Sequence, residues 1–136
     1  MGDGHATSPC VRHRCDLCCR DTRMSLTEAD ARRLVRAGHA GFSRLHSDGT
    51  IRLRNVDGRC VFLEGGRCRA YPDRPDGCVL YPLIWFTDTL EADLHDFCPH
   101  RNEFRFSSGD REWLRRSIET EDAEVAARRA RSCDES

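Results

Sequence analysis

Cysteines are the residues of this chain best suited to chemistry, and eight of its nine cysteines fall into an ordered series. The first four lie in the segment "CVRHRCDLCC", and the others follow at wider intervals. The candidate site residues are Cys10, Cys15, Cys18, Cys19, Cys60, Cys68, Cys78 and Cys98. The ninth, Cys133, stands alone in the polar segment "RRARSCDES", and we expect it to belong to no site. Thiols at this density serve as disulfides, as nucleophiles or as ligands of a soft metal.

A disulfide framework is disfavoured by the number of cysteines and by the expected compartment. Nine cysteines cannot all pair within one chain. The segment "MGDGHATSPC" has neither the basic nor the apolar part of a signal peptide. We therefore expect a cytoplasmic protein whose thiols stay reduced.

A cysteine nucleophile would need a base held beside it in space. The candidate histidines are His13, His46, His95 and His100, and none lies at an informative spacing from a cysteine. The chain contains no lysine, which excludes enzymes that use a Schiff-base lysine or a phosphate-loop lysine. These features favour a protein without independent catalytic activity and leave open a role as a redox accessory protein.

A metal centre explains the cysteine spacing better. Cys15, Cys18 and Cys19 would share one face of a helix, and converging thiolates need a cation to compensate their charge. Soft sulfur ligands select zinc, copper(I) or iron–sulfur clusters. Arginines beside the cysteines would help to keep the thiols deprotonated. These are Arg14, Arg20, Arg59, Arg67 and Arg69.

The spacing favours an iron–sulfur cluster over zinc and leaves the number of centres open. Structural zinc sites usually contain two C-x2-C knuckles, and only Cys15 and Cys18 have that spacing here. The later cysteines lie at wide and irregular intervals, as is common for cluster ligands. Eight thiols also exceed what one tetrahedral ion uses. The sequence therefore allows two metal centres or one cluster with spare thiols.

Short elements separated by turns must position these cysteines. A capping box of Ser25 and Glu28 and a stop at Gly38 predict a helix over 25–37. Alternating residues in 50–63 predict short strands with a turn at Asp57-Gly58, and "EGGRC" predicts a tight turn before Cys68. Three prolines keep 70–83 in turns and short helical pieces. A helix is expected at about 110–129, with Trp113, Leu114, Ile118 and Val125 on its inner side.

The composition favours a small α+β domain that depends on its metal. Only 38% of the residues are hydrophobic and 33% are charged, which suits a chain stabilised by a metal. We expect one loop-rich domain with short strands and two or three helices, organised around a cysteine-bound metal centre. Residues 1–9 are expected to be a flexible tail, 10–130 the domain (core 10–98, packing helix about 110–129) and 131–136 a polar tail.

Charge and hydropathy also limit the expected partners. The net charge of −1 gives no indication of nucleic-acid binding or of attraction to an anionic membrane. The most apolar run, "VLYPLIWF", is far too short to span a bilayer. The expected partner is a redox protein or another protein whose identity the sequence does not give.

The cysteine blocks resemble the CxxCxxCC cysteine-cluster family, the YkgJ-type proteins described as chelating zinc or iron. The family's opening C-x2-C-G-x-C-C corresponds here to Cys10-x4-Cys15-Asp16-Leu17-Cys18-Cys19, with a longer first spacing and with Asp16 in place of glycine. The segments "CVFL", "CRAYPDRP" and "CVLYP" are similar to its C-x-F-L, C-x-x-Y-x-x-R-P and C-x-x-[YF]-P. The resemblance covers about residues 10–98. In the "CRAYPDRP" block we expect Arg74 to donate to a sulfur or to brace a carbonyl.

Three functions are consistent with these observations. The first is an iron–sulfur protein, expected to hold a 4Fe-4S cluster, that transfers electrons or senses redox state. The second is a zinc-stabilised interaction module without chemistry of its own. The third is an accessory domain of an enzyme whose catalytic part is another chain.

Overall fold

A computed structural model of the chain describes residues 19–20, 22–96 and 98–135. These ranges contain three α-helices, two 3-10 turns and nine short strands. The helices are α3 (Glu28–Arg36), α4 (Asp76–Leu80) and α5 (Ser108–Glu135), and the 3-10 turns are η2 (Tyr71–Asp73) and η3 (Arg101–Glu103). The strands are β1 (Ser25–Leu26), β2 (Ser43–Leu45), β3 (Ile51–Leu53), β4 (Asn55–Val56), β5 (Arg59–Cys60), β6 (Leu63–Glu64), β7 (Arg67–Cys68), β8 (Leu83–Phe86) and β9 (Glu91–Leu94). The predicted α+β class with short strands and two or three helices is confirmed.

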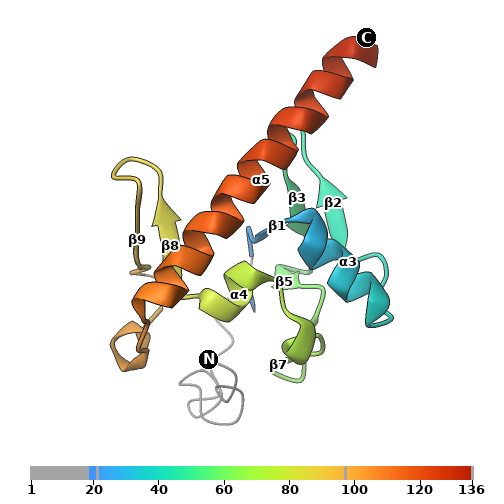
Figure 1. Ribbon diagram of the computed structural model, residues 1–136. Helices are drawn as coiled ribbons and strands as arrows, with labels where there is room; N and C mark the ends of the chain where they lie inside the picture. The colour runs from blue at the N-terminus through green and yellow to red at the C-terminus, as the bar shows by residue number, and fades with distance from the viewer. Residues whose placement is uncertain (1–18, 21, 97, 136) are drawn as a thin grey trace.

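The long helix α5 runs diagonally across the molecule and separates two groups of strands (Figure 1). On one side lies the antiparallel hairpin β8–β9, and on the other lies a three-stranded antiparallel sheet in the order β1-β3-β2, next to α3. The short helix α4 packs against both α5 and β8. Two further hairpins, β4–β5 and β6–β7, follow the sheet directly in the chain.

Helix α3 begins later than its sequence pattern suggested. Its N-cap is Thr27, and the capping box pairs Thr27 with Asp30: the Asp30 amide donates to the Thr27 hydroxyl, and the Thr27 amide donates to the Asp30 carboxylate. The predicted cap, Ser25, is wrong because Ser25 belongs to β1, where it pairs with Arg52. The C-terminal end was predicted correctly. Gly38 adopts a left-handed φ of 96°, and its amide donates to the Val35 carbonyl.

Helix α5 is longer at both ends than the expected 110–129. It begins at Ser108 because Ser107 and Asp110 form a second capping box, in which each backbone amide donates to the other residue's side chain. It then continues to Glu135, through most of the segment expected to be a polar tail. Of its expected inner residues, Leu114 is buried, whereas Trp113, Ile118 and Val125 are half-buried. No helix in the described ranges is long and apolar enough to cross a membrane.

The hairpins β4–β5 and β6–β7 are two copies of one eight-residue unit, which we name the tandem hairpins (residues 55–62 and 63–70). Each has a two-residue turn with both φ angles positive: Asp57-Gly58 at 53° and 77°, and Gly65-Gly66 at 59° and 79°. Such turns match the twist of paired strands and favour glycine, as the sequence predicted. In each unit the second strand is Arg-Cys, and the residue after that strand closes the hairpin with a backbone hydrogen bond, from Val61 to Arg54 or from Arg69 to Phe62, each 2.8 Å long.

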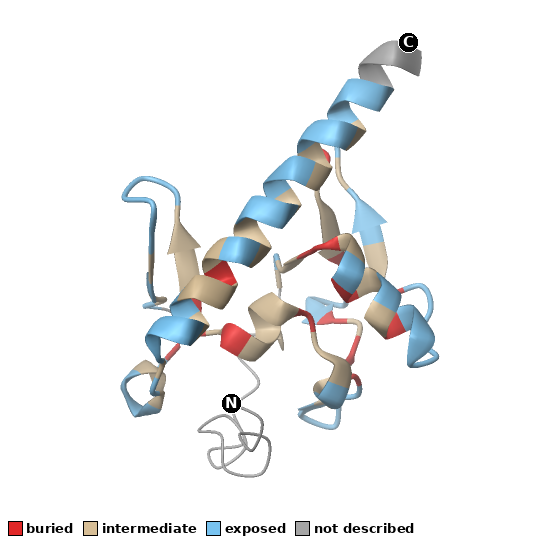
Figure 2. Cartoon of the chain, viewed as in Figure 1, coloured by how far each residue is buried: buried red, intermediate tan, exposed pale blue. Residues whose placement is uncertain are grey.

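The buried residues, red in Figure 2, include two hydrophobic clusters. The first cluster, which we name the thiol-side core, lies among α3, the three-stranded sheet and the tandem hairpins. Its members are Leu26, Leu34, Phe42, Leu53, Cys60, Phe62 and Ala70. The second, the helix-side core, lies beneath α5 and consists of Leu80, Leu83 and Leu114. Cysteine therefore contributes to only one of these two cores.

Candidate metal centre

Cys60 and Cys68 occupy equivalent positions at the ends of the tandem hairpins. Cys60 pairs with Asn55 across the first hairpin, and Cys68 pairs with Leu63 across the second. Cys60 is 5% exposed and belongs to the thiol-side core, against which the half-buried Cys68 packs. The two sulfurs lie within electrostatic reach of each other, since a charge on Cys60 would raise the pKa of Cys68.

Each of these two thiols accepts a hydrogen bond from the backbone amide two residues further along the chain. The donors are the amides of Phe62 for Cys60 and of Ala70 for Cys68. Such donors stabilise a thiolate, but burial has the larger effect and raises the pKa of both thiols. In the absence of a cation, both sulfurs are therefore held in the protonated form. A bound metal would reverse this preference by compensating the thiolate charge.

Cys19 reaches the same core through its neighbour in the chain. Arg20 forms an antiparallel β-bridge with Arg59, which places Cys19 beside Cys60. The following segment is fixed by Asn55, whose side chain accepts from the Thr22 amide at 3.0 Å and donates to the Thr22 carbonyl at 2.8 Å. Cys19 packs against the thiol-side core and is half-buried.

Helix α4 carries Cys78, and Arg74 shapes the loop that leads into it. The guanidinium of Arg74 stacks on the Tyr71 ring at 3.8 Å, donates to the Tyr71 carbonyl at 3.0 Å and donates to the Cys78 carbonyl at 3.4 Å. Arg74 also lies close enough to Cys68 to favour its thiolate form. Of the two roles expected for this arginine, the bracing of a carbonyl is confirmed. Cys78 is half-buried and packs against the thiol-side core.

Gly77 allows α4 to approach the thiol-side core closely. A Cβ atom at this position would lie 2.4 Å from the Met24 sulfur, well below any normal contact. Met24 itself packs against that core. A side chain at position 77 would therefore require the Met24 side chain to move.

A buried network of hydrogen bonds and an ion pair, not predicted from the sequence, holds α4 against α3. Asp30 is 2% exposed, and its carboxylate accepts from the Asp76 amide at 3.1 Å and from Arg33 at 3.0 Å. Arg33 also donates to the Arg74 carbonyl at 2.7 Å. Burial and the nearby Asp30 raise the pKa of Asp76, and hydrogen bonds from Trp113 and Arg33 oppose that rise. The signal available in the sequence was Asp30 on the apolar face of a predicted helix.

Cys98 is buried in the segment between β9 and η3. It is 3% exposed and is a member of neither core cluster. Its amide donates to the His95 carbonyl at 3.3 Å, and Arg101 donates to its carbonyl at 3.1 Å. The His95 ring in turn shares a hydrogen bond of 2.6 Å with the Tyr81 hydroxyl. The segment before Cys98 is thereby tied to the residue that follows α4.

The structure thus gathers four predicted ligands around one core without completing a site. Cys19, Cys60, Cys68 and Cys78 pack on the thiol-side core, while Cys10, Cys15 and Cys18 lie outside the described residues. Among the residues that the structure describes, no three cysteine, histidine or carboxylate side chains are arranged to hold a metal ion. No disulfide joins any two of the described cysteines.

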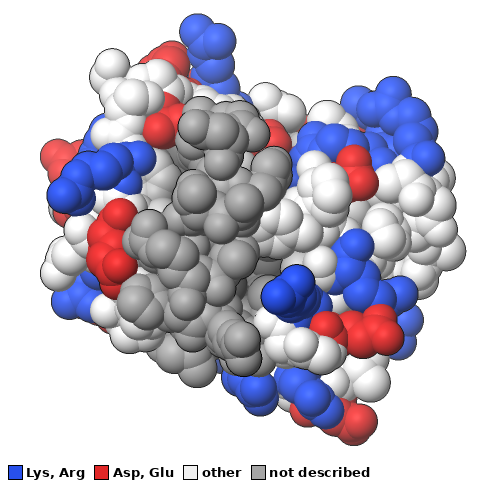
Figure 3. Space-filling view, turned by 90° about the horizontal axis from the view of Figure 1, so that it is seen from below, with Lys and Arg blue, Asp and Glu red and all other residues white. Residues whose placement is uncertain are grey.

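The face of the protein shown in Figure 3 carries both positively and negatively charged side chains. In the described part of the surface in Figure 3, arginine and carboxylate side chains are interspersed, and neither forms a continuous area. The arginines nearest the thiols are partly committed to protein acceptors. Arg69, for example, forms an ion pair with Glu64 at 3.2 Å and donates a hydrogen bond to the Val61 carbonyl at 3.2 Å.

The donor set fits a soft metal. Four cysteines lie in or against the otherwise apolar thiol-side core, and two of them already receive backbone hydrogen bonds of the kind that support bound thiolates. Cys19, Cys60, Cys68 and Cys78 are the described residues that would hold such a metal.

Comparison with known proteins also points to a metal-binding domain. No curated protein and no solved structure matches this chain at a significant level. One family does match, over residues 9–104, and its description is "Putative zinc- or iron-chelating domain". This range contains all eight predicted ligands and excludes Cys133. The match covers most of the chain, which therefore belongs to the CxxCxxCC family.

Proposed function

We propose that this protein binds a metal centre through cysteine thiolates and that the centre is an iron–sulfur cluster used for electron transfer or redox sensing. The observation that carries the proposal is the pair Cys60 and Cys68: thiols at equivalent positions in two similar hairpins, each with an amide donor and within electrostatic reach of the other. Cys19 and Cys78 approach the same core from other segments. The proposed ligands beyond these four are Cys10, Cys15, Cys18 and Cys98.

Iron–sulfur is preferred because ligands from several separate segments suit a cluster. A cluster, expected to be 4Fe-4S, would supply one-electron chemistry, while the chain's part is to hold the thiolates and limit solvent access. The Phe62 and Ala70 amides and the Arg74 guanidinium would stabilise negative charge on Cys60 and Cys68. The proposal includes no catalytic residue and places the protein in a reducing compartment such as the cytoplasm.

Zinc is the second candidate, and the family's description supports it equally. A tetrahedral zinc ion would use four of the eight thiols and would fix the fold without redox chemistry. The protein would then act as a structural or interaction module. Such a centre would leave several thiols available for a second ion.

Metal analysis of anaerobically purified protein distinguishes the two candidates. An iron–sulfur protein is expected to be brown, with absorbance near 400 nm and comparable amounts of iron and sulfide. A colourless protein with stoichiometric zinc would establish the second candidate. Cys68→Ser is expected to lose metal, and Cys133→Ser is the matched control that should retain it. Retention of full metal by Cys68→Ser would contradict the ligand assignment.

A further inference from the structure

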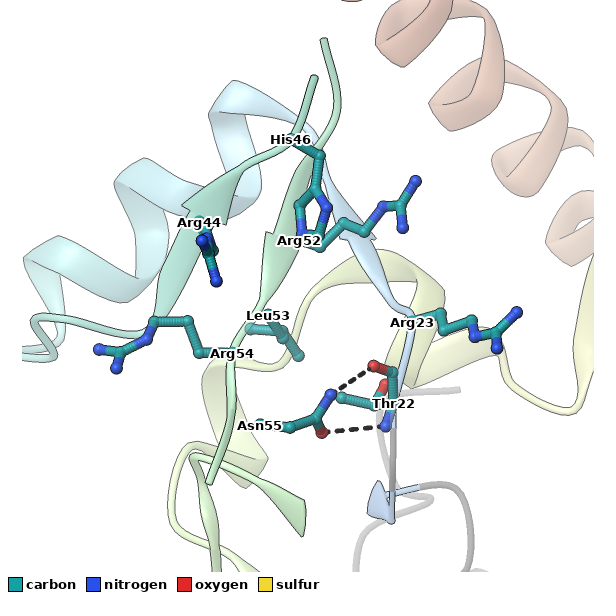
Figure 4. A pocket seen from close by; sticks show the side chains of 8 residues that line it. All are labelled: Thr22, Arg23, Arg44, His46, Arg52, Leu53, Arg54 and Asn55. Atoms are coloured by element: carbon teal, nitrogen blue, oxygen red, sulfur yellow. Dashed lines mark hydrogen bonds between the residues drawn. The ribbon is translucent and has the colours of Figure 1, made fainter. Parts of the chain in front are cut away.

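A second site of a different chemical kind lies on the outer face of the three-stranded sheet. A hollow of about 350 Å³ opens there, and we name it the basic hollow after its five basic lining residues (Figure 4). These are Arg23, Arg44, His46, Arg52 and Arg54. In Figure 4 the guanidinium of Arg54 extends to one side and those of Arg23 and Arg52 to the other, with His46 and Arg44 above the strands. Four of the five basic residues are arginines, so the lining carries an excess of positive charge.

The pleat of the strands explains why basic residues gather on this face. Leu53 turns into the thiol-side core, so Arg52 and Arg54 on either side of it turn outward. Arg44 stands directly opposite Arg52 in the antiparallel pair β2–β3. Like charges opposite one another destabilise a sheet. An anion held between them would remove that cost.

Much of this positive charge has no counter-charge within the protein. Arg52 is paired with Asp48 at 2.7 Å, and hydrogen bonds from Thr50 and Arg52 lower the pKa of Asp48 to about 2. Arg54 donates to the Gly41 carbonyl, which is neutral. Among the described residues, Arg23 and Arg44 bond no carboxylate, and no acidic side chain lines the hollow. The hollow thus has an excess of guanidinium donors.

We propose that the basic hollow binds a small phosphate-bearing anion, such as a phosphate monoester. The planar fork of arginine matches the oxygens of phosphate, and several forks around one hollow suit a doubly charged group. The other lining residues, Thr22, Leu53 and Asn55, include no aromatic ring on which a base could stack. The net charge of −1 likewise argues against a nucleic-acid track.

The test is calorimetric titration of the full-length, metal-loaded protein with phenyl phosphate, with benzoate as the matched carboxylate probe. Phenyl phosphate is expected to bind more tightly than benzoate. Arg44→Ala should weaken its binding about tenfold, the size of one charged hydrogen bond, and Arg44→Lys should weaken it less. Arg36→Ala, an exposed arginine on α3, is the control and should leave binding unchanged.

Several outcomes would overturn the proposal. These are the absence of phenyl phosphate binding, equal binding of benzoate, and binding that Arg44→Ala leaves intact. Tighter binding of a short oligothymidylate with the same dependence on Arg44 would make the hollow a nucleic-acid site instead. Metal content is measured in each variant and should not change, which keeps this test separate from that of the metal centre.

Discussion

The tandem hairpins and the helix-side core are stabilised by different interactions. In residues 55–70, two tight turns and short ladders set the backbone, and the groups directed inward include sulfur. In the helix-side core, Leu114 of the long helix α5 packs with Leu80 and Leu83. Leu83 belongs to the hairpin β8–β9, whose strands have four residues each. Burial of leucine side chains stabilises the fold without any ligand. Buried thiols without a cation remain protonated, so the stabilisation that a metal would provide is missing. The hairpins should therefore depend on metal, and the helix region should not.

Removal of the metal should have the largest effect. Structural zinc contributes about 10 kcal/mol to folding in small metal domains, and a cluster held by the same thiols should matter comparably. We expect amide hydrogen exchange to become fast in residues 55–70 after chelation, while β8, β9 and α5 keep most of their protection. Hydrogen exchange measured by mass spectrometry on loaded and stripped protein provides the check. Equal loss of protection in both regions would abolish the proposed distinction.

Leu83→Ala should destabilise the helix-side core without affecting the metal. Leu83 is 1% exposed, and removal of a buried leucine side chain costs about 2–5 kcal/mol. Urea unfolding should show this loss, while the metal content per folded chain stays the same. Leu90→Ala is the matched control, because Leu90 is 70% exposed and should change stability little. Loss of metal in Leu83→Ala would mean that the two cores are coupled.

Gly58→Ala and Gly66→Ala test whether the tandem hairpins are equivalent. Both glycines have left-handed φ angles and open space at the Cβ position, so only the backbone conformation opposes alanine. Each substitution should cost about 1 kcal/mol. Thermal unfolding of metal-loaded protein measures the two effects side by side, with Gly109→Ala in the first turn of α5 as the control. A difference of more than about 1 kcal/mol between the two variants would show that the copies are not equivalent.

Glu121→Gln should give the smallest effect and a dependence on pH. Burial raises the pKa of Glu121 above its ordinary 4.5, against a hydrogen bond from Ser25. The folded state therefore binds this proton more tightly than the unfolded state, and stability falls as the pH rises from about 4.5 through the folded-state pKa. At pH 7 the variant should melt about 2 °C higher than the parent protein.

The same substitution should give no gain at pH 4, where the parent carboxyl is protonated in the folded state. Melting curves at the two pH values, on loaded and stripped protein, provide the measurement. A gain that persisted unchanged at pH 4 would show that ionisation is not its cause.

Local signals in the sequence predicted the local structure well. The turns at Asp57-Gly58 and Gly65-Gly66, the stop at Gly38 and the short pieces around the prolines all depend on a few adjacent residues. The start of α3 was wrong because Ser25 is drawn into a strand by Arg52, far away in the chain. Capping rules consider only adjacent residues, so they cannot predict a pairing between distant segments.

The sequence predicted the family but not the geometry of the candidate site. The cysteine blocks identified the family, whereas the grouping of Cys19 with Cys60 depends on a bridge between Arg20 and Arg59. The bracing of α4 depends on Asp30 and Arg33, whose partners lie more than forty residues away. The basic hollow was missed because its arginines look like ordinary surface charge until the strands place them on one face.

The eight-residue period of the tandem hairpins has a genetic consequence. Each copy is closed by its own hydrogen bond, from Val61 to Arg54 or from Arg69 to Phe62, so its two ends lie close together. An in-frame duplication or deletion of eight codons would add or remove one complete turn with its cysteine and would leave the flanking segments near their original positions. Length changes of other sizes would interrupt a ladder. Family members that differ in this segment should therefore differ in steps of eight residues, each step changing the number of available thiols by one.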